Sequence, residues 1–455
     1  MKAYQHLLMI FSTLVLSSCS DDSDSQASQF DNLFTSSNCS VSGANDQLFS
    51  LLQEKYFWNE GLPKSIDSNA YDSLSDALYE LRDEKDRFSF VLTYEEYEDY
   101  ANSVFFGYGF GHEITQGNDG LRIKYVFEEG SAAQNGLQRG DIITKVGDDL
   151  VSDLVAQVIA GTTTFSDIFG PNEDGYSVEV TFVKPDSTVV VADFSKGSIV
   201  ANTVMASETK ELTIDGESKN VAYMVFDSFK ESSQTEINTA FTQFKTDNVD
   251  EMILDLRYNG GGLISVANQL SSQIGGYNVE DEIFLSYQFN ENQSSKNESI
   301  LFSLGQGIEQ LNLDKLVVLT TESSCSASEL VINALDPFLD VTIVGDTTCG
   351  KPIGMSPELV CDHVIYAINF QTMNAVGFGD YFDGLPATCS VADEVTGNWG
   401  DDNDPILAEG LNYLATGQCS ASSASSKLLN QNKNQKSTIR KDLSIKDMML
   451  HKDAI

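Results

Sequence analysis

A serine and a lysine are spaced so that together they could carry out nucleophilic catalysis. Ser326 stands where an apolar run gives way to a helical pattern, and Lys351 follows 25 positions later in a Gly-Lys pair. A serine hydroxyl attacks a carbonyl group when a base takes its proton and hydrogen-bond donors hold the oxyanion. Lysine is such a base when burial keeps its amine neutral. Serine and lysine are therefore the residue types that a hydrolase with a Ser-Lys dyad requires.

The same residues also have a purely structural interpretation. Ser326-x-x-Glu329 fits a capping box, in which serine and glutamate satisfy the first N–H groups of a helix. Lys351, taken alone, is typical of a surface lysine. Histidine is the more usual base, but the four histidines of the chain lie outside motifs that predict such a role: His6, His112, His363 and His451.

A strand–helix–strand unit is predicted around this serine. The apolar run 316–319 predicts a buried strand, and apolar residues from Ala327 to Leu335 recur at the spacing of one helix face. Asp336-Pro337 ends that helix, because proline disfavours the helical conformation of the residue before it. Residues 341–345 predict the next strand. This βαβ unit would present the Ser326 hydroxyl beside the N–H groups of a helix terminus.

The Ser-Ala-Ser-Glu sequence and the distant Gly-Lys pair resemble the carboxyl-terminal processing (tail-specific) proteases over most of residues 40–419. The resemblance implies that Ser326 is the nucleophile, Lys351 the general base and Glu329 an orienting residue. It implies an α/β fold, with a layered core like those of crotonase and Clp protease built from βαβ units. It also implies a PDZ-like β domain and a small N-terminal helical domain. No cofactor or metal is expected.

A glycine-rich turn supplies the expected oxyanion hole. Residues 254–262 read LDLRYNGGG and resemble the strand-to-glycine motif of the family, which usually has proline where Gly260 stands. The resemblance assigns the oxyanion to the N–H groups of Gly261 and Ala327. A plain glycine turn is the alternative. The chain departs from the family at Met355, where a glutamine often supports the lysine amine.

The remaining domains follow from composition and pattern. We expect a signal peptide at 1–18, a flexible tether at 19–38, an N-terminal helical domain at 39–100, a PDZ-like domain at 101–195, the protease core at 196–419 and a disordered tail at 420–455. Residues 130–143 closely resemble the PDZ pattern. Such a domain binds a peptide as an added strand and captures its carboxylate. The glycine-spaced loop is the expected peptide-binding element: Gly107, Gly109 and Phe110.

The chain has seven cysteines, and six remain when Cys19, whose lipid attachment is considered below, is set aside. An even number of cysteines in an exported chain favours disulfide bonds. Cys349 and Cys361 flank Lys351 and are expected to pair, as are Cys389 and Cys419. Cys39 would then be left for Cys325. A zinc site is the alternative, but no CxxC pair or HExxH pattern supports it.

The N-terminus and the net charge indicate the compartment and exclude some partners. Leu16-Ser17-Ser18-Cys19 resembles a bacterial lipobox, so Cys19 is expected to carry a lipid; a plain cleaved signal is the alternative. We expect an outer-membrane lipoprotein facing the periplasm, touching the membrane through that lipid only. A formal charge of −41 argues against nucleic acid as a partner.

The sequence therefore predicts a serine endopeptidase of the cell envelope that recognises protein or peptide substrates through their C-terminal tails. Two other classes stay open. The chain could be a non-catalytic peptide-binding lipoprotein that kept the fold, or a carrier of small ligands, because one fold hosts unrelated functions. The oligomeric state is not predicted.

Overall fold

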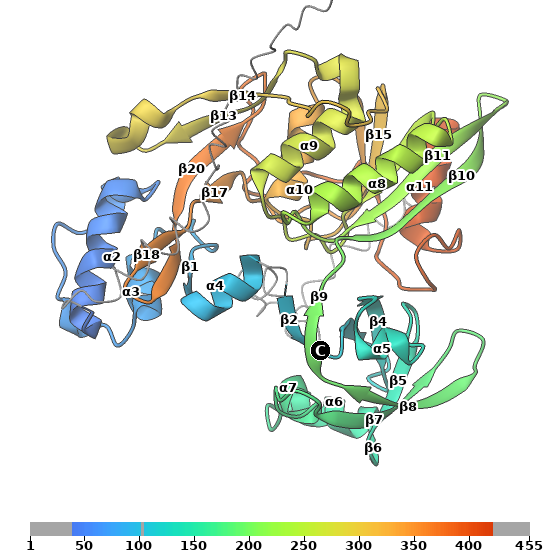
Figure 1. Ribbon diagram of the computed structural model, residues 1–455, viewed down its shortest axis with the longest axis horizontal. Helices are drawn as coiled ribbons and strands as arrows, with labels where there is room; N and C mark the ends of the chain where they lie inside the picture. Colours follow the sequence, from blue (N-terminus) through green and yellow to red (C-terminus); the bar gives the residue numbers. More distant parts are fainter. Residues whose placement is uncertain (1–38, 102–103, 422–455) are drawn as a thin grey trace, which may run out of the picture.

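The computed structural model describes residues 39–101 and 104–421. A mostly parallel sheet forms the core of the part that follows residue 203 (Figure 1). Its strand order is β10-β11-β12-β15-β16-β21. The pairs are parallel except β10, which is antiparallel to β11. The strands span Val204–Ile214 (β10), Glu217–Phe226 (β11), Glu251–Asp255 (β12), Lys315–Thr320 (β15), Asp340–Gly345 (β16) and Cys389–Ser390 (β21).

Helices cover both faces of this sheet. Because side chains alternate along a strand, Met224 and Leu254 point to one face and Tyr223 and Ile253 to the other. The first face packs against α8 (Ser233–Thr246), α9 (Ile264–Gly275) and α10 (Ala327–Leu335), and the second against α11 (Pro405–Thr416). The sheet is therefore buried on both sides, as parallel sheets usually are.

Two smaller sheets extend the core toward the N-terminal region. One has the order β14-β13-β20-β17, with strands Ser299–Leu301, Ile283–Phe289, Ile368–Met373 and Ile353–Met355. The short helices η3 (Gly276–Val279) and η4 (Glu291–Lys296) flank β13. The other sheet has the order β1-β19-β18, with strands Phe90–Thr93, His363–Tyr366 and Glu358–Val360.

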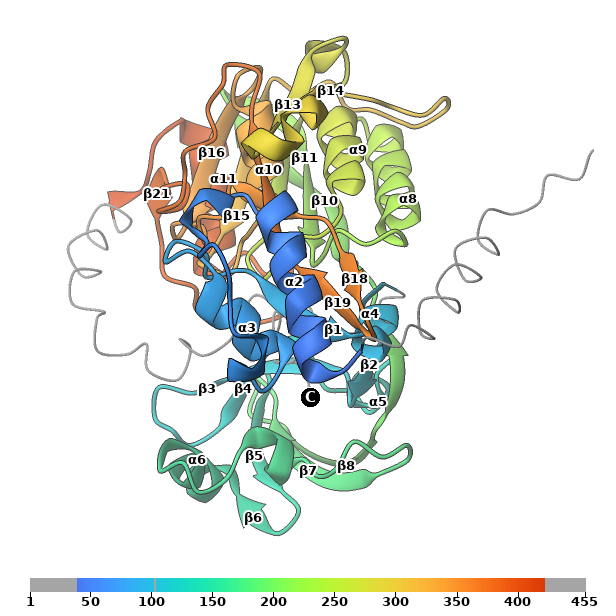
Figure 2. The ribbon, with the colours of Figure 1, turned by 90° about the vertical axis from the view of Figure 1, so that its left-hand side faces the viewer.

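The N-terminal region is helical and is joined to the core by a shared sheet. It contains α2 (Val41–Lys55), η1 (Asn59–Gly61), η2 (Ser68–Ala70), α3 (Leu74–Leu81) and α4 (Tyr94–Ala101). Figure 2 shows α2 and α3 beside β1, β18 and β19. The strand β1 pairs with β19, so the region predicted as a separate helical domain contributes a strand to a sheet of the core.

A β domain follows the N-terminal region in the sequence and precedes the strands of the core. Its sheet contains β3 (Phe110–Ile114), β4 (Leu121–Val126), β5 (Ile142–Val146), β6 (Asp149–Leu150), β7 (Ser177–Val183) and β8 (Val189–Ser195). The helices are α5 (Ser131–Gln134), α6 (Val151–Ile159) and α7 (Phe165–Ile168). A two-stranded ribbon of β2 (Val104–Gly107) and β9 (Gly197–Val200) connects the domain to its neighbours, so β pairing continues past the predicted boundary at residue 195.

The predicted fold class is confirmed: the chain has a layered α/β core with additional domains. Cys19, the predicted signal peptide, the whole predicted tether and nearly all of the predicted tail lie outside the described residues. Within the described part, no helix has both the length and the apolar character needed to span a membrane.

Candidate active site

Ser326 occupies a strained turn between β15 and α10. Its backbone has φ 56° and ψ −112°, a conformation that non-glycine residues rarely adopt and that is often found at functional sites. The turn is held from both sides, because Cys325 N donates to Asn259 O at 3.0 Å and Leu330 N donates to Ser326 O at 2.8 Å. The serine is partly exposed, whereas the residues on either side of it are buried. The turn therefore presents a hydroxyl at the start of a helix.

Glu329 links this turn to the loop that carries Lys351. Its fully buried carboxylate accepts hydrogen bonds from Ser326 N (2.9 Å) and Lys351 N (2.8 Å). It also accepts from Gly350 N (2.7 Å) and from Thr348 Oγ1 (2.5 Å). Burial raises the pKa of Glu329, and these four donors oppose that shift. A capping box would explain only the bond to Ser326, so the carboxylate also fixes the lysine loop.

Lys351 is buried and its pKa is lowered. Only 3% of the residue is exposed, and loss of solvation brings the pKa of its amine down to about 8, against the opposing charges of Asp86 and Glu329. The Nζ atom lies 5.6 Å from the centroid of the Phe88 ring. An amine in this environment is largely neutral at mildly alkaline pH and can accept a proton.

Gly261 lies directly against the serine turn. A Cβ atom on Gly261 would come within 2.8 Å of Ser326 Cβ and 3.0 Å of Ala327 N, and φ is +107°, so glycine is required here. Ala327 is the first residue of α10, where an N–H group has no partner within the helix. The structure thus brings Gly261, Ser326 and Ala327 together.

The amide of Gly261 differs from expectation in one respect. Its N–H group donates to Asn259 Oδ1 at 2.9 Å, so it is already engaged. The asparagine is itself fixed, because its Nδ2 donates to Phe226 O at 2.9 Å. The two-donor oxyanion hole implied by the resemblance is therefore not preformed here. Gly261 N–H would have to leave Asn259 before it could bind an oxyanion.

The disulfide bonds correct two of the three predicted pairs. Cys389 bonds to Cys419, as predicted, with Cα atoms 5.5 Å apart. The other predictions are wrong, because the bonds are Cys325–Cys349 and Cys39–Cys361.

The fold explains these pairings. Cys349 N donates to Ser324 O at 3.0 Å, which brings the lysine loop against the serine turn. Cys361 instead lies in the turn between β18 and β19, where the N-terminal region packs. One disulfide therefore joins the residue before Ser326 to the loop of Lys351.

The side chain of Phe110, in the expected peptide-binding loop, is not available to a peptide. Phe110 is fully buried in the core of the β domain, so only its backbone could contact a peptide. Gly109 has φ +97°, and a Cβ atom there would lie 2.7 Å from Gly130 Cα. Gly107 ends β2 and pairs with Gly197 of β9. These glycines permit close backbone packing, and β3 beyond them is an edge strand of its sheet.

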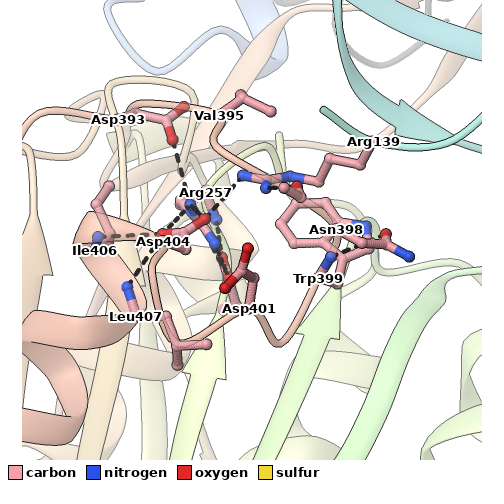
Figure 3. Close-up of polar contacts among 12 residues, drawn as sticks. Arg139, Arg257, Asp393, Val395, Asn398, Trp399, Asp401, Asp404, Ile406 and Leu407 are labelled. Carbon is pink, nitrogen blue, oxygen red and sulfur yellow. Dashed lines mark hydrogen bonds and ion pairs between the residues drawn. The ribbon is translucent and has the colours of Figure 1, made fainter. Parts of the chain in front are cut away.

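Sequence reasoning missed a buried ionic network around Arg257, and Figure 3 shows Arg257 and Arg139 beside Asp404. Arg257, 1% exposed, donates to Asp255 (2.6 Å from Nη2) and to Asp404 (2.9 Å from Nη1). Arg139 of the β domain donates to the same Asp404 at 3.1 Å, and its guanidinium lies 4.1 Å from the centroid of the Trp399 ring. The network connects the β domain, the glycine turn and the start of α11. Arg257 belonged to a quoted motif, but nothing local indicated its partners.

Two other residues considered from the sequence have ordinary surroundings. His363 is partly exposed, and its Nδ1 lies 2.7 Å from Asp362 Oδ1. Met355 is partly buried and packs with apolar residues of the N-terminal region. Its side chain has no amide that could support the lysine, as a glutamine at this position would. Met355 has no basic group, and the ring of His363 contacts the adjacent carboxylate.

Comparison with known structures identifies the class of fold. The crystal structure of a "Putative S41 protease" from Bacteroides fragilis NCTC 9343 superposes with a TM-score of 0.68 at 21% identity. The superposition covers 82% of this chain and 97% of that chain. The protein therefore has the fold of the S41 proteases.

The family models agree with this fold. Residues 220–374 match Peptidase family S41, and residues 43–90 match the Peptidase S41 N-terminal domain. These two matches lie in the core and in the N-terminal region, and neither includes the β domain between them.

Curated proteins that are similar to this chain carry the names of carboxyl-terminal processing peptidases. The chain is 22% identical over 316 residues to "Probable CtpA-like serine protease" of Staphylococcus epidermidis, covering 68% of this chain and 56% of that protein. It is 25% identical over 229 residues to "Carboxyl-terminal-processing peptidase 3, chloroplastic" of Arabidopsis thaliana, covering 49% and 41%. The chain spans about half the length of the curated relatives it matches.

Proposed function

We propose that this protein is a serine endopeptidase in which Ser326 attacks the peptide carbonyl and Lys351 takes the proton of its hydroxyl. The observation that carries the proposal is the bridge made by Glu329, which fixes a buried, low-pKa lysine beside a strained serine turn. Attack forms a bond from Oγ to the carbonyl carbon, and the proton passes to the leaving amine as the peptide bond breaks. Water then hydrolyses the acyl-enzyme by the same route in reverse.

The oxyanion is the part of the mechanism that requires movement. Ala327 N–H is proposed as the first donor to the oxyanion, and Gly261 N–H as the second after it leaves Asn259. Formation of the oxyanion during attack would drive that exchange, because an oxyanion is a stronger acceptor than a neutral amide oxygen. No cofactor is proposed for this chemistry.

A quenched fluorescent, unfolded peptide tests the proposal directly. The wild-type protein should cleave it, and Ser326→Ala should not. Ser323→Ala is the matched control, because Ser323 lies in the same turn and is also partly exposed. A wild-type protein that binds the peptide without cleaving it would instead favour the non-catalytic peptide-binding alternative.

The rate of cleavage should rise with pH through the titration of Lys351. Because burial lowers the pKa of this lysine to about 8, the amine is protonated and inactive well below that value and neutral above it. Each unit of pH below the pKa should reduce kcat/KM about tenfold. A profile of kcat/KM from pH 6 to 10 measures this limb, and a rate independent of pH over that range would contradict it.

The disulfide beside the site should affect turnover as well as stability. The Cys325→Ser/Cys349→Ser variant loses the cross-link between the serine turn and the lysine loop, so we expect a loss of about 3 kcal/mol in the free energy of unfolding. Displacement of the base should also lower kcat about 10²-fold. Cys389→Ser/Cys419→Ser is the matched control, with a similar sequence separation. It should lose similar stability but keep its turnover, whereas equal kcat values in the two variants would refute this role.

We further propose that the β domain captures substrate tails in the manner of a PDZ domain. The edge strand β3 can accept a peptide as an added strand, and the backbone around Gly107 and Gly109 is the proposed binding place for the terminal carboxylate. Peptides of one sequence with a free or an amidated C-terminus test this idea. The amidated peptide should show a KM about tenfold higher at the same kcat, since a charge-assisted contact is lost. Equal KM values would argue against capture of the tail.

The N-terminal sequence is the basis for a proposal about the subcellular location of the protein. We propose cleavage before Cys19 and lipid attachment to it, which would anchor the protein at the outer membrane facing the periplasm. Mass spectrometry of the mature N-terminus and fractionation of Cys19→Ser test both points. A wild-type protein with an unmodified N-terminus in the soluble fraction would contradict the anchor.

A further inference from the structure

A segment of the N-terminal region lies against the loop of Lys351. Arg87 Nη2 donates to Cys349 O at 2.5 Å and to Phe382 O at 3.4 Å, both carbonyl groups of the core. The next residue, Phe88, is buried, and its ring centroid lies 5.6 Å from Lys351 Nζ. The amine therefore has residues of the N-terminal region on one side and Glu329 bound to its own backbone on the other.

Asp86, at the start of this segment, is a buried carboxylate held in one orientation. It is 2% exposed, and its Oδ1 accepts from Phe88 N (3.0 Å) and Ser89 N (2.8 Å). Its Oδ2 accepts from Tyr56 Oη (2.7 Å) and Ser89 Oγ (2.5 Å). All four donors are neutral, so they fix the carboxylate without cancelling its charge. A buried charge of this kind acts strongly on an ionisable neighbour, because little water screens it.

We propose that Asp86 is a positioning residue for Lys351, and that it supplies from the N-terminal region the polar support that Met355 cannot give to the amine. Met355 packs with the same apolar cluster of the N-terminal region and has only a thioether. The inference rests on the proposed role of Lys351 as the base. It makes the N-terminal region part of the catalytic apparatus, where it would otherwise serve only as a scaffold.

The charged groups near Lys351 act on the pKa of its amine in one direction, opposite to that of burial. Burial lowers the pKa of the amine, and the carboxylates of Asp86 and then Glu329 oppose this effect. Tyr56 and Tyr381 lie beside these carboxylates, and burial raises the pKa of each, so both phenols stay neutral. Arg87 is exposed and its guanidinium is bound to backbone carbonyls. Asp86 therefore keeps the amine basic enough to take a proton from serine, while burial keeps it neutral in part of the population.

Titration of Lys351 by NMR tests this pairing without requiring turnover. The protein carries lysine labelled with ¹³C at Cε, in a Ser326→Ala background, and the Lys351 signal is assigned by its loss in Lys351→Met. Asp86→Asn should lower the pKa of Lys351 by about 1 unit, because it removes a negative charge and keeps the shape. Glu84→Gln is the charge control, since Glu84 is exposed in the same loop, and it should cause no shift. Tyr56→Phe removes a donor to Asp86 but keeps the charge, so the lysine pKa should change by less than about 0.3 units.

Two outcomes would overturn the proposal. One is an unchanged Lys351 pKa in Asp86→Asn, and the other is an equal shift in Tyr56→Phe, which would indicate only a structural role. If Asp86→Asn does not fold, Asp86→Ser decides, because it removes the same charge with a smaller polar side chain. The pKa of Lys351 should again fall, and an unchanged value would refute the pairing.

Turnover separates this inference from the proposed function. In the protein with Ser326 intact, Asp86→Asn should move the rising limb of the kcat/KM profile to lower pH by the same amount as the NMR shift. A protein without peptidase activity but with the NMR coupling would contradict the proposed function alone. An active protein without the coupling would contradict the role of Asp86 alone.

Discussion

Lys351→Met should lower kcat by at least about 10⁴-fold, with the fold retained. The methionine fills the buried site but cannot accept the proton of Ser326. Lys351→Arg should be equally inactive, because a guanidinium stays charged in proteins. The measurement is kcat on a quenched peptide, with circular dichroism and thermal unfolding to establish that each variant is folded.

A double-mutant cycle makes this test sharper. Ser326→Ala should have an effect of similar size, and the Ser326→Ala/Lys351→Met variant should be hardly worse than either single variant, because the two groups act as one unit. Additive losses would mean that they act independently.

Lys230 provides the competing assignment of the base. It is also buried, and loss of solvation lowers its pKa to about 7. It lies beyond Phe229, whose backbone pairs with the glycine turn. If Lys230→Met abolished peptide cleavage while Lys351→Met did not, the base would be Lys230.

Arg257→Met should destabilise the protein by about 3–5 kcal/mol, because it leaves buried carboxylates without their main partner. Asp255 is fully buried and Asp404 is 1% exposed, and both accept from the Arg257 guanidinium. Tyr223 Oη and the N–H of residue 257 would still donate to Asp255. Asp404 would keep Arg139 and the N–H groups of Ile406 and Leu407, so of these donors only Arg139 carries a positive charge. Urea unfolding of the variant and wild type gives the difference in the free energy of unfolding.

Arg82→Met is the matched control for this change. Arg82 is partly exposed on the N-terminal region and stacks over the Tyr79 ring. Its substitution should change the free energy of unfolding by less than about 0.5 kcal/mol. Equal destabilisation in the two variants would show that the buried network contributes nothing specific. A fully stable Arg257→Met would mean that its carboxylates find other partners or become protonated.

The sequence by itself determined the chemistry proposed for this protein. Ser326, Glu329 and Lys351 occupy a strand–turn–helix pattern whose apolar spacing already specifies the local structure. The predicted strands 316–319 and 341–345 lie within β15 and β16, and the predicted helix from Ala327 to Leu335 is α10. These features are readable because hydrophobic periodicity and turn chemistry act over a few residues.

Only the tertiary structure decided which distant residues meet. Cys325 pairs with Cys349 because the lysine loop returns to the serine turn, which spacing alone did not reveal. Asn259 engages the Gly261 amide that resemblance assigned to the oxyanion, and the ring of Phe88 in the N-terminal region lies 5.6 Å from Lys351 Nζ. Such contacts depend on how helices and sheets pack across hundreds of residues. Burial then fixes the charge state of the lysine, because desolvation is a property of the folded chain.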